Sequence, residues 1–255
     1  MHGSPAPTTI IPSELLLTAY RAGVFPMADH RDDPEVYWVE PRERAVFPLE
    51  DFRVSKSLRK TIRQDRFRVT CDADFAATIA ACAEPREAFA ESWISHRIEA
   101  SYLALHLAGH AHSFECWQAD DTEEGEERWR LVGGLYGVAF DRVFCGESMF
   151  SRVPDASKVA LAWLVACMKS AGYRVLDCQF MTDHLASLGA QAMPQKAYLE
   201  KVREARGTPD ASLPQAWARY ASVSASALSS EASEDGAEPP PSSGKLIAQS
   251  FTKTS

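Results

Sequence analysis

The sequence predicts an α+β fold in which a mostly antiparallel sheet is flanked by helices. Two strand-like runs at residues 112–117 and 129–136 are separated by residues 118–128, which are rich in Asp and Glu. Such a segment is typical of a solvated loop, so the two runs are expected to form a hairpin. Helical spacing at residues 156–171 and an apolar run at residues 174–180 indicate a long helix followed by a buried strand.

The start of the chain predicts a small N-terminal domain that comprises residues 1–64. Ser13 is the expected N-cap of a helix at residues 13–23, and Gly23 is expected to end it. Residues 36–47 alternate short apolar runs with prolines, which is typical of irregular strands. Residues 55–64 then predict a short basic helix.

A second domain is predicted at residues 65–221, and it contains the hairpin and the buried strand. Its other expected strands lie at residues 67–71 and 138–144, and its other expected helices at residues 75–82, 98–108, 182–188 and 195–206. The remaining residues, 222–255, are rich in Ser, Pro and Glu and contain one aromatic residue, Phe251. We expect this tail to be disordered, because it cannot bury enough apolar surface to offset the loss of conformational entropy.

Composition limits the class of protein. The 255 residues are 45% hydrophobic and 24% charged, which excludes a collagen and a chain that is disordered throughout. No run approaches the roughly 20 apolar residues of a membrane-spanning helix, and the N-terminus lacks the pattern of a secretory signal. We therefore expect a cytoplasmic protein without a membrane partner. The formal charge of −8 argues against a wholly basic nucleic-acid binder, so a nucleic-acid partner would require a local basic patch.

Three features that could indicate chemistry have simpler explanations. The six cysteines form no CxxC pair, so we expect reduced thiols, and Cys178 is interpreted as a spectator and not as a nucleophile. His106 and His110 have ligand spacing, but Gly109 lies between them and no further ligand motif supports a metal site. The glycines at positions 133, 134 and 137 lack the Lys and the helix of a P-loop, and they indicate a bulge or a place where a ligand approaches the sheet backbone closely.

Basic residues concentrate in one segment of this acidic chain. Lys56, Arg59, Lys60 and Arg63 fall on one face of the predicted helix, and Arg66 follows it. A solvated helix face is one explanation. A surface that binds nucleic-acid phosphates is the other, and it explains why the positive charge is concentrated here.

Polar residues within apolar strands form a second candidate site. Asp177 and Gln179 are two positions apart in the predicted buried strand, so their side chains are expected on the same face. Glu147 lies in a second polar segment at a strand end. Buried groups of this kind are hydrogen-bonded, functional, or both, and the residues alone leave these alternatives open.

Several motifs, in this order and spacing, resemble the leucyl/phenylalanyl-tRNA-protein transferase family. The resemblance covers about residues 11–206 and leaves the tail outside. The matching segments are Gly-Val-Phe-Pro at 23–26, Glu-Ser-Trp-Ile ending at 94, Gly-His-Ala-His-Ser at 109–113, Leu-Val-Gly-Gly-Leu-Tyr-Gly-Val at 131–138, Phe-Cys-Gly-Glu-Ser-Met-Phe-Ser-Arg at 144–152, Asp-Cys-Gln at 177–179 and Asp-His-Leu-Ala-Ser-Leu-Gly-Ala at 183–190.

The resemblance implies an aminoacyltransferase. Such an enzyme moves leucine or phenylalanine from aminoacyl-tRNA to the N-terminal Arg or Lys of acceptor proteins, which marks them for degradation. It also implies that the domain at residues 65–221 is an acetyltransferase-like (GNAT-like) catalytic domain. We expect a monomer that needs no cofactor and no metal. The alternatives are an acyl-coenzyme-dependent N-acetyltransferase and a non-enzymatic RNA-binding module.

The resemblance also implies roles for individual residues. Asp177 would polarise Gln179, which draws on the incoming amine, and Glu147 would help to position the amine or the aminoacyl group. The basic residues, from Lys56 to Arg66, would hold the tRNA acceptor stem by its phosphates. The residues implied for the amino-acid pocket and the donor are Leu135, Phe144, Met149, Leu164, Leu176 and Trp93.

The chain departs from the family pattern at positions close to these motifs. Many members carry Trp directly after the Phe-Pro pair, where it can stack on the terminal adenosine, whereas this chain has Met27. The stacking contact is therefore expected to be weaker or to be made by Trp38 or Trp93. Thr182 also stands where Asn is usual.

Overall fold

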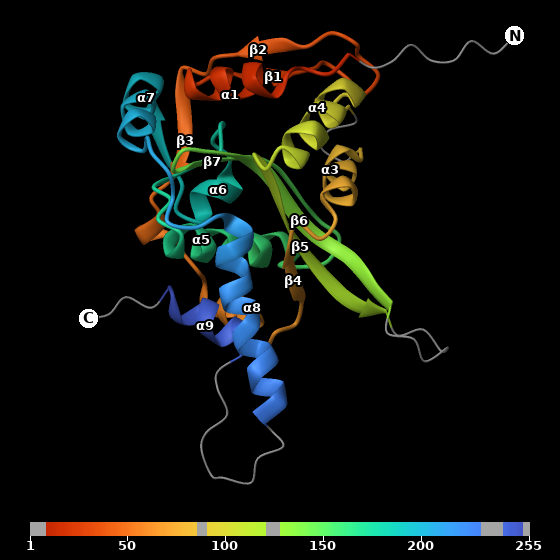
Figure 1. Cartoon of the computed structure of the whole chain (residues 1–255), viewed down its shortest axis with the longest axis vertical. Coiled ribbons are helices and arrows are strands. Elements are labelled where there is room, and N and C mark those ends of the chain that lie inside the picture. The colour runs from red at the N-terminus through yellow and green to blue at the C-terminus, as the bar shows by residue number, and fades with distance from the viewer. Residues whose placement is uncertain (1–8, 86–90, 121–127, 231–241, 252–255) are drawn as a thin grey trace, which may run out of the picture.

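The computed structural model describes residues 9–85, 91–120, 128–230 and 242–251 (Figure 1). In this part of the chain, seven strands form one sheet and two short strands, β1 (Phe25–Met27) and β2 (Tyr37–Val39), pair separately. In spatial order the large sheet contains β4 (Arg68–Cys71), β5 (Ala111–Asp120), β6 (Arg128–Phe140), β7 (Val143–Ser151), β8 (Val175–Asp177), β3 (Glu43–Phe47) and β9 (Gln191–Pro194). All neighbours are antiparallel except β7 and β8, which confirms the predicted α+β class.

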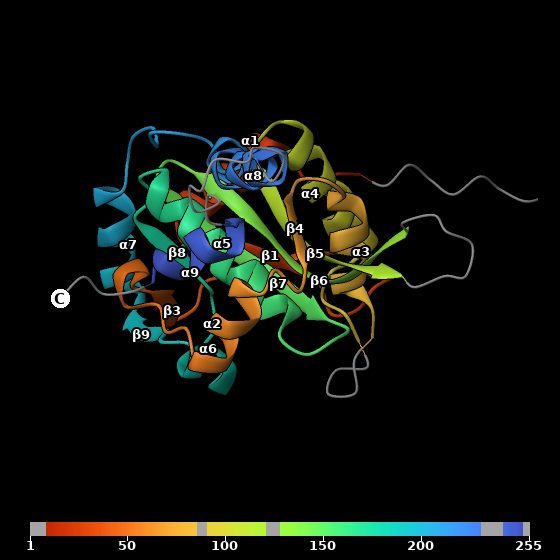
Figure 2. The same cartoon turned by 90° about the horizontal axis from the view of Figure 1, so that it is seen from below.

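Helices cover both faces of this sheet and bury a hydrophobic cluster on each. One cluster involves α2 (Lys56–Arg63), α5 (Ala156–Ser170), α8 (Leu213–Ser230) and α9 (Ser243–Gln249), which Figure 2 shows on the same side of the molecule. The other involves α1 (Ser13–Arg21), α3 (Phe75–Ala83), α4 (His96–Leu107) and α7 (Gln195–Glu204). The short helices η1 (Leu49–Asp51) and α6 (Asp183–Ser187) complete the described fold, in which no helix combines the length and apolarity needed to cross a membrane.

Local sequence explains several helix ends. Ser55 and Thr182 cap α2 and α6, because their hydroxyls accept hydrogen bonds from the backbone N–H groups of Leu58 and Leu185. Gly23 follows α1 with φ of 78°, the left-handed conformation predicted for it. The N-cap prediction for Ser13 is wrong: α1 begins at Ser13, and Pro12 occupies the cap position without a side-chain hydrogen bond.

The predicted strand at residues 138–144 is wrong, because β6 continues through Val138 and ends at Phe140. The chain turns at Asp141, which has φ of 50°, and β7 begins at Val143. The glycines do not break β6. They let other parts of the protein approach it, since a Cβ at Gly133 would lie 2.5 Å from the Cβ of Ala156, and the β6–β7 register shifts beside Gly137. This shift confirms the predicted bulge.

The predicted domain boundary at residue 64 does not separate two sheets. Strand β3 belongs to residues 1–64, yet it pairs with β8 on one side and with β9 on the other. Strand β9 itself was not predicted, because Gln191–Pro194 is short, half polar and ends in proline. The pairing of β3 with β8 places the N-terminal segment beside the end of β8, where the candidate site lies.

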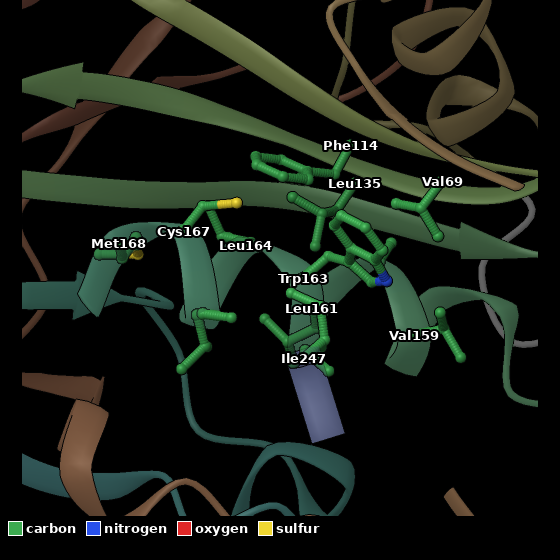
Figure 3. Packing of buried hydrophobic residues seen from close by; sticks show 14 of the residues in the cluster. Val69, Phe114, Leu135, Val159, Leu161, Trp163, Leu164, Cys167, Met168 and Ile247 are labelled. Carbon is green, nitrogen blue, oxygen red and sulfur yellow. The ribbon is translucent and has the colours of Figure 1, made fainter. Parts of the chain in front are cut away.

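The expectation of a disordered tail is wrong for its described parts. Helix α8 extends to Ser230, and α9 packs on α2, α5 and α8, whereas residues 231–241 and 252–255 lie outside the described residues. Ile247 of α9 is fully buried, and Figure 3 shows it on the side of α5 that faces away from Phe114 and Leu135. The Asp65 carboxylate accepts a 2.9 Å hydrogen bond from the backbone N–H of Gly244. A few apolar residues suffice to order α9, because α2, α5 and α8 provide an apolar surface on which it packs.

We expect Ile247→Ala to lower the free energy of unfolding by about 2–4 kcal/mol, because the substitution leaves a cavity in a packed core. Urea denaturation measures this loss, and Lys245→Ala on the exposed side of α9 is the matched control, with an expected change within about 0.5 kcal/mol. Equal stability of the two variants would show that α9 does not pack as described.

Candidate active site

A cavity of about 470 Å³ opens beside β7 and the end of β8. Five of the six residues predicted for the pocket line it, namely Leu135, Met149, Leu164, Leu176 and Trp93. The sixth, Phe144, does not: its side chain is fully buried and its ring packs under Gly137 in the core between the sheet and α5. A strand pattern shows that a residue is buried, but it does not distinguish a cavity wall from the core behind it.

Other apolar side chains in the wall were not predicted. Met27, Leu161, Phe180 and Leu185 line the cavity, whereas Trp38, which pairs with Pro26 across the two-stranded sheet, is not part of the lining. Trp93 is therefore the tryptophan that the structure places at the cavity. Helical spacing could have identified Leu161, because it lies three residues before Leu164 on the same face of α5.

Glu147 lies at the polar end of the cavity with its side chain almost buried, at 8% exposure. One carboxylate oxygen accepts a 3.0 Å hydrogen bond from the side-chain amide of Gln179, and the other accepts a 3.2 Å bond from the hydroxyl of Tyr102. The Tyr102 hydroxyl is also hydrogen-bonded to that of Tyr20. Burial raises the pKa of Glu147 to about 7, although the hydrogen bonds oppose this shift.

Asp177 is fully buried and does not line the cavity. It forms a two-point ion pair with the buried Arg44, whose Nε donates to Oδ1 over 3.2 Å and whose Nη2 bonds Oδ2. Oδ1 also accepts a 2.8 Å hydrogen bond from the backbone N–H of Gln179. Asp177 therefore contacts the backbone of Gln179, while the side-chain amide of Gln179 points to Glu147.

The predicted buried strand at residues 174–180 is wrong at both ends, because β8 spans Val175–Asp177 only. Gln179 has φ of 61°, so the alternation of a strand does not explain why it lies beside Asp177. Tertiary contacts fix this turn: the backbone groups of Ala45 bond those of Cys178 and Gln179, over 2.8 and 3.0 Å. Asp177 and Gln179 are joined through the backbone N–H of Gln179, and not by side chains on one face of a strand as predicted.

Arg44 was missed by the sequence prediction. It lies within the apolar strand β3, which is the signal that could have found it, because an arginine at such a position needs a buried partner. Its guanidinium is 4.4 Å from the ring centroid of Tyr198 and 5.1 Å from that of Phe25. Burial lowers the pKa of Arg44, but Asp177, Tyr198 and Cys145 together raise it above its usual value, so the guanidinium stays protonated.

The basic residues of α2 do not all share one exposed face. Lys56, Lys60 and Arg63 are exposed on the helix, and Arg66 is exposed beyond its end. Arg59 is half-buried, donates a 3.4 Å hydrogen bond to the carbonyl of Phe251, and lines a second, larger cavity.

The contacts of Cys178, His106 and His112 are those of structural residues. Burial raises the pKa of the Cys178 thiol, which opposes formation of a nucleophilic thiolate, and all six cysteines are free thiols. His106 bonds the carbonyl of Ala111 over 2.8 Å, and His112 bonds the carboxylate of Asp72 over 2.7 Å. In the described ranges, no three His, Cys, Asp or Glu side chains are grouped so that they could hold a metal ion.

The raised pKa of Glu147 predicts a specific pH dependence of stability. The unfolded chain releases this proton near pH 4.5 and the folded protein near pH 7, so the contribution is present below pH 4.5 and lost as pH rises through about 7. Relative to Glu147→Gln, the free energy of unfolding of the wild type should fall over this range by up to about 3 kcal/mol. Urea denaturation at a series of pH values measures the difference, and parallel curves for the two proteins would contradict the buried position of the carboxylate.

Comparison with known proteins gives a consistent result. The family model described as leucyl/phenylalanyl-tRNA protein transferase matches residues 46–203, and the model of its N-terminal domain matches residues 11–42. Three relatives with the name leucyl/phenylalanyl-tRNA–protein transferase come from Novosphingobium aromaticivorans, Zymomonas mobilis subsp. mobilis and Rhizorhabdus wittichii. They are 62%, 53% and 54% identical, over 77%, 78% and 77% of this chain and 71%, 70% and 76% of their own length. The chain therefore belongs to the leucyl/phenylalanyl-tRNA protein transferase family.

Proposed function

We propose that the protein transfers leucine or phenylalanine from aminoacyl-tRNA to the N-terminal Arg or Lys of acceptor proteins and so marks them for degradation. The observation that carries this proposal is an apolar cavity with Glu147 and Gln179 hydrogen-bonded to each other at its polar end. Family membership and the names of the relatives support it. The acetyltransferase-like (GNAT-like) assignment of residues 65–221, the cytoplasmic location and the monomeric state are parts of the same proposal.

The apolar wall is suited to the aminoacyl side chain of the donor. Leu135, Met149, Leu164 and Leu176 offer no hydrogen-bond partner, so a polar side chain would lose its bonds to water without replacement. A leucine or phenylalanine side chain loses none and buries apolar surface. The wall therefore favours an apolar aminoacyl group, with a preference set by shape.

The polar end of the cavity is suited to the attacking amine. Gln179 donates to Glu147 through its amide nitrogen, which leaves its oxygen to accept a hydrogen bond from the amine. The amine attacks the ester carbonyl, the bond to the ribose oxygen breaks, and the proton that the amine loses is finally taken up by that oxygen as a hydroxyl group. The pKa of Glu147 near 7 lies close to that of an α-amine, about 8, so Glu147 can accept this proton at little cost. Aminolysis of an ester requires no cofactor, and we propose none.

The charge around the cavity favours a cationic acceptor. Its described lining includes the carboxylates of Glu91, of Glu147 and of Glu84, which is paired with Arg152 over 2.6 Å, and it contains no lysine or arginine. An acceptor that carries an N-terminal Arg or Lys brings positive charge to this end of the site, where unlike charges attract.

The donor distinguishes this function from acyl-coenzyme-dependent acetylation. A peptide with an N-terminal arginine is incubated with the protein and either leucyl-tRNA or acetyl-coenzyme A, and its mass is measured. We expect the addition of a leucyl group with leucyl-tRNA and no change with acetyl-coenzyme A. Acetylation without tRNA, and no leucyl transfer, would overturn the proposal. An RNA-binding module without activity would leave the buried network of Glu147, Gln179 and Tyr102 unexplained.

The exposed face of α2 predicts a salt-dependent contact with tRNA. If Lys60 and Arg63 each neutralise a phosphate, the logarithm of affinity falls with the logarithm of salt by roughly 0.7 to 0.9 per contact. Replacing both by alanine should weaken tRNA binding at low salt and flatten this slope by roughly 1.5. Filter binding across a salt series measures both quantities. An unchanged slope would show that α2 is a solvated face.

A further inference from the structure

Two residues of the active-site cavity, Met27 and Trp93, come from segments that are far apart in the sequence but hydrogen-bonded to each other. Met27 ends β1, and residues 28–36 connect it to β2. Trp93 lies just before the start of α4 at His96. The backbone N–H of Ala28 donates a 3.3 Å hydrogen bond to the carbonyl of Trp93. The two lining residues are therefore next to a contact that joins both segments.

Arg31 extends this contact along the chain. Its Nη1 donates a 2.8 Å hydrogen bond to the carbonyl of Ile94, and its Nη2 forms an ion pair with Glu99 in the first turn of α4. The backbone carbonyl of Arg31 accepts a 3.0 Å hydrogen bond from the N–H of His96. One residue thus holds the segment that follows Trp93 at Ile94, His96 and Glu99.

A second ion pair joins the same two segments but is more exposed. His96 contacts Asp32 over 3.3 Å, and these side chains are 60% and 86% exposed, so water and salt screen the interaction. The side chains of Arg31 and Glu99 are 28% and 18% exposed. Their ion pair is screened less, and the guanidinium also bonds a backbone carbonyl. We therefore assign the relative position of the two segments mainly to Arg31.

Trp93 depends on such contacts because it lies between α3 and α4, outside the helices and strands of the described chain. No regular hydrogen-bond ladder fixes its backbone. After it, the hydroxyl of Ser95 caps α4 by accepting a hydrogen bond from the N–H of Ile98. An aromatic side chain that is held in place before a ligand arrives binds it with a smaller loss of conformational entropy.

We propose that Arg31 is a positioning residue for donor binding, which holds Trp93 in the cavity wall against which the aminoacyl-adenosine end of the donor packs. An indole ring offers a flat apolar surface to a base or to a leucyl side chain. Arg31 does not line the cavity, and the hydrogen bonds of Glu147 and Gln179 do not involve it. It therefore acts on binding and not on the chemical step. This inference rests on the proposed function, which places the aminoacyl ester in the cavity.

Substitutions of Arg31 test the assignment. Arg31→Gln removes the guanidinium, whereas Arg31→Lys keeps the positive charge without the planar fork that serves Ile94 and Glu99 together. The matched control is Arg142→Gln, because Arg142 also donates to the carbonyl of a distant residue, Thr208 over 3.2 Å, but lies outside the cavity lining. Steady-state transfer to an N-terminal arginine peptide gives kcat, the KM of leucyl-tRNA and the KM of the peptide.

We expect Arg31→Gln to raise the KM of leucyl-tRNA about tenfold and to change kcat and the KM of the peptide by less than about twofold, because it weakens donor binding alone. Arg31→Lys should lie between this variant and the wild type, and the control should behave as the wild type. Partial unfolding cannot imitate this result, since it lowers kcat and leaves KM unchanged. An unchanged KM of leucyl-tRNA, or an equal rise in the KM of the peptide, would overturn the inference.

Trp93→Ala tests whether Arg31 acts through Trp93. If it does, adding Arg31→Gln to Trp93→Ala raises the KM of leucyl-tRNA further by less than about twofold, although each substitution alone raises it. Two increases that multiply would show that Arg31 acts independently of Trp93 and would also overturn the inference. A wild type that transfers no leucine would instead overturn the proposed function, so the two failures are distinguishable.

Discussion

Replacing Gln179 by alanine is expected to lower the single-turnover rate of leucyl transfer by roughly 10² to 10³-fold, the usual loss for one proton-transfer or oxyanion-type contact. Gln179 donates a 3.0 Å hydrogen bond to Glu147 and is the amide at the polar end of the cavity. The substitution removes the side-chain oxygen that accepts a hydrogen bond from the amine. It also removes the hydrogen bond that holds the Glu147 carboxylate in place. Rapid-quench measurements with saturating leucyl-tRNA give the rate directly.

The affinity for tRNA should stay within twofold in the same variant, because Gln179 lines the active-site cavity and the basic residues of α2 do not. Filter binding measures this affinity, and Gln118→Ala on β5, outside the cavity lining, is the matched control for the amide deletion. A rate loss of less than about tenfold would show that Gln179 is structural. An equal loss of rate and of tRNA affinity would assign it to donor binding.

Replacing Asp177 by alanine is expected to lower the free energy of unfolding by about 3–5 kcal/mol, the usual cost of leaving one buried charge without its partner. Arg44 and Asp177 are 1% and 0% exposed, so water cannot compensate the guanidinium when the carboxylate is removed. Urea denaturation measures the loss. The double variant Arg44→Met with Asp177→Leu leaves no unpaired charge and should recover much of this stability.

Substitutions of Asp177 also distinguish a positioning role from a direct role in the reaction. In the structure Asp177 holds the backbone of Gln179 and does not line the cavity, so it acts on the reaction by positioning Gln179. Asp177→Asn keeps one acceptor for this backbone N–H and should therefore retain more activity than Asp177→Ala. If Asp177→Ala is as stable as the wild type and still loses transfer, Asp177 acts on the substrate directly, contrary to the observed contacts.

The parts of the fold that could be predicted are those with strong local signals. The long helix α5, the basic helix α2 and the pairing of β5 with β6 follow from neighbouring residues, whereas residues 121–127 of the predicted acidic loop lie outside the described residues. The parts that were wrong depend on distant contacts. Strand β6 passes through three glycines because α5 and β7 approach there, and α9 forms because Ile247 finds an apolar site made by the rest of the chain.

The candidate site shows the same division. Glu147, Asp177 and Gln179 could be identified from motifs, since each stands in a short polar segment within apolar strands. Their contacts could not, because Tyr20, Arg44 and Tyr102 come from helices and strands far away in the sequence. Phe144 was assigned to the pocket but lies in the core, because the sequence of a strand does not show whether a buried apolar residue borders a cavity.

The proposed function requires that this cavity join an aminoacyl group to a cationic N-terminus, and the choice of acceptor is its sharpest test. Single-turnover transfer from radiolabelled leucyl-tRNA is measured with three peptides that differ only at the first residue: free N-terminal arginine, N-acetylated arginine and free N-terminal aspartate. We expect transfer to the free arginine peptide alone, because the amine must be nucleophilic and the described cavity lining carries carboxylates without lysine or arginine. No transfer to that peptide, or equal transfer to the aspartate peptide, would contradict it.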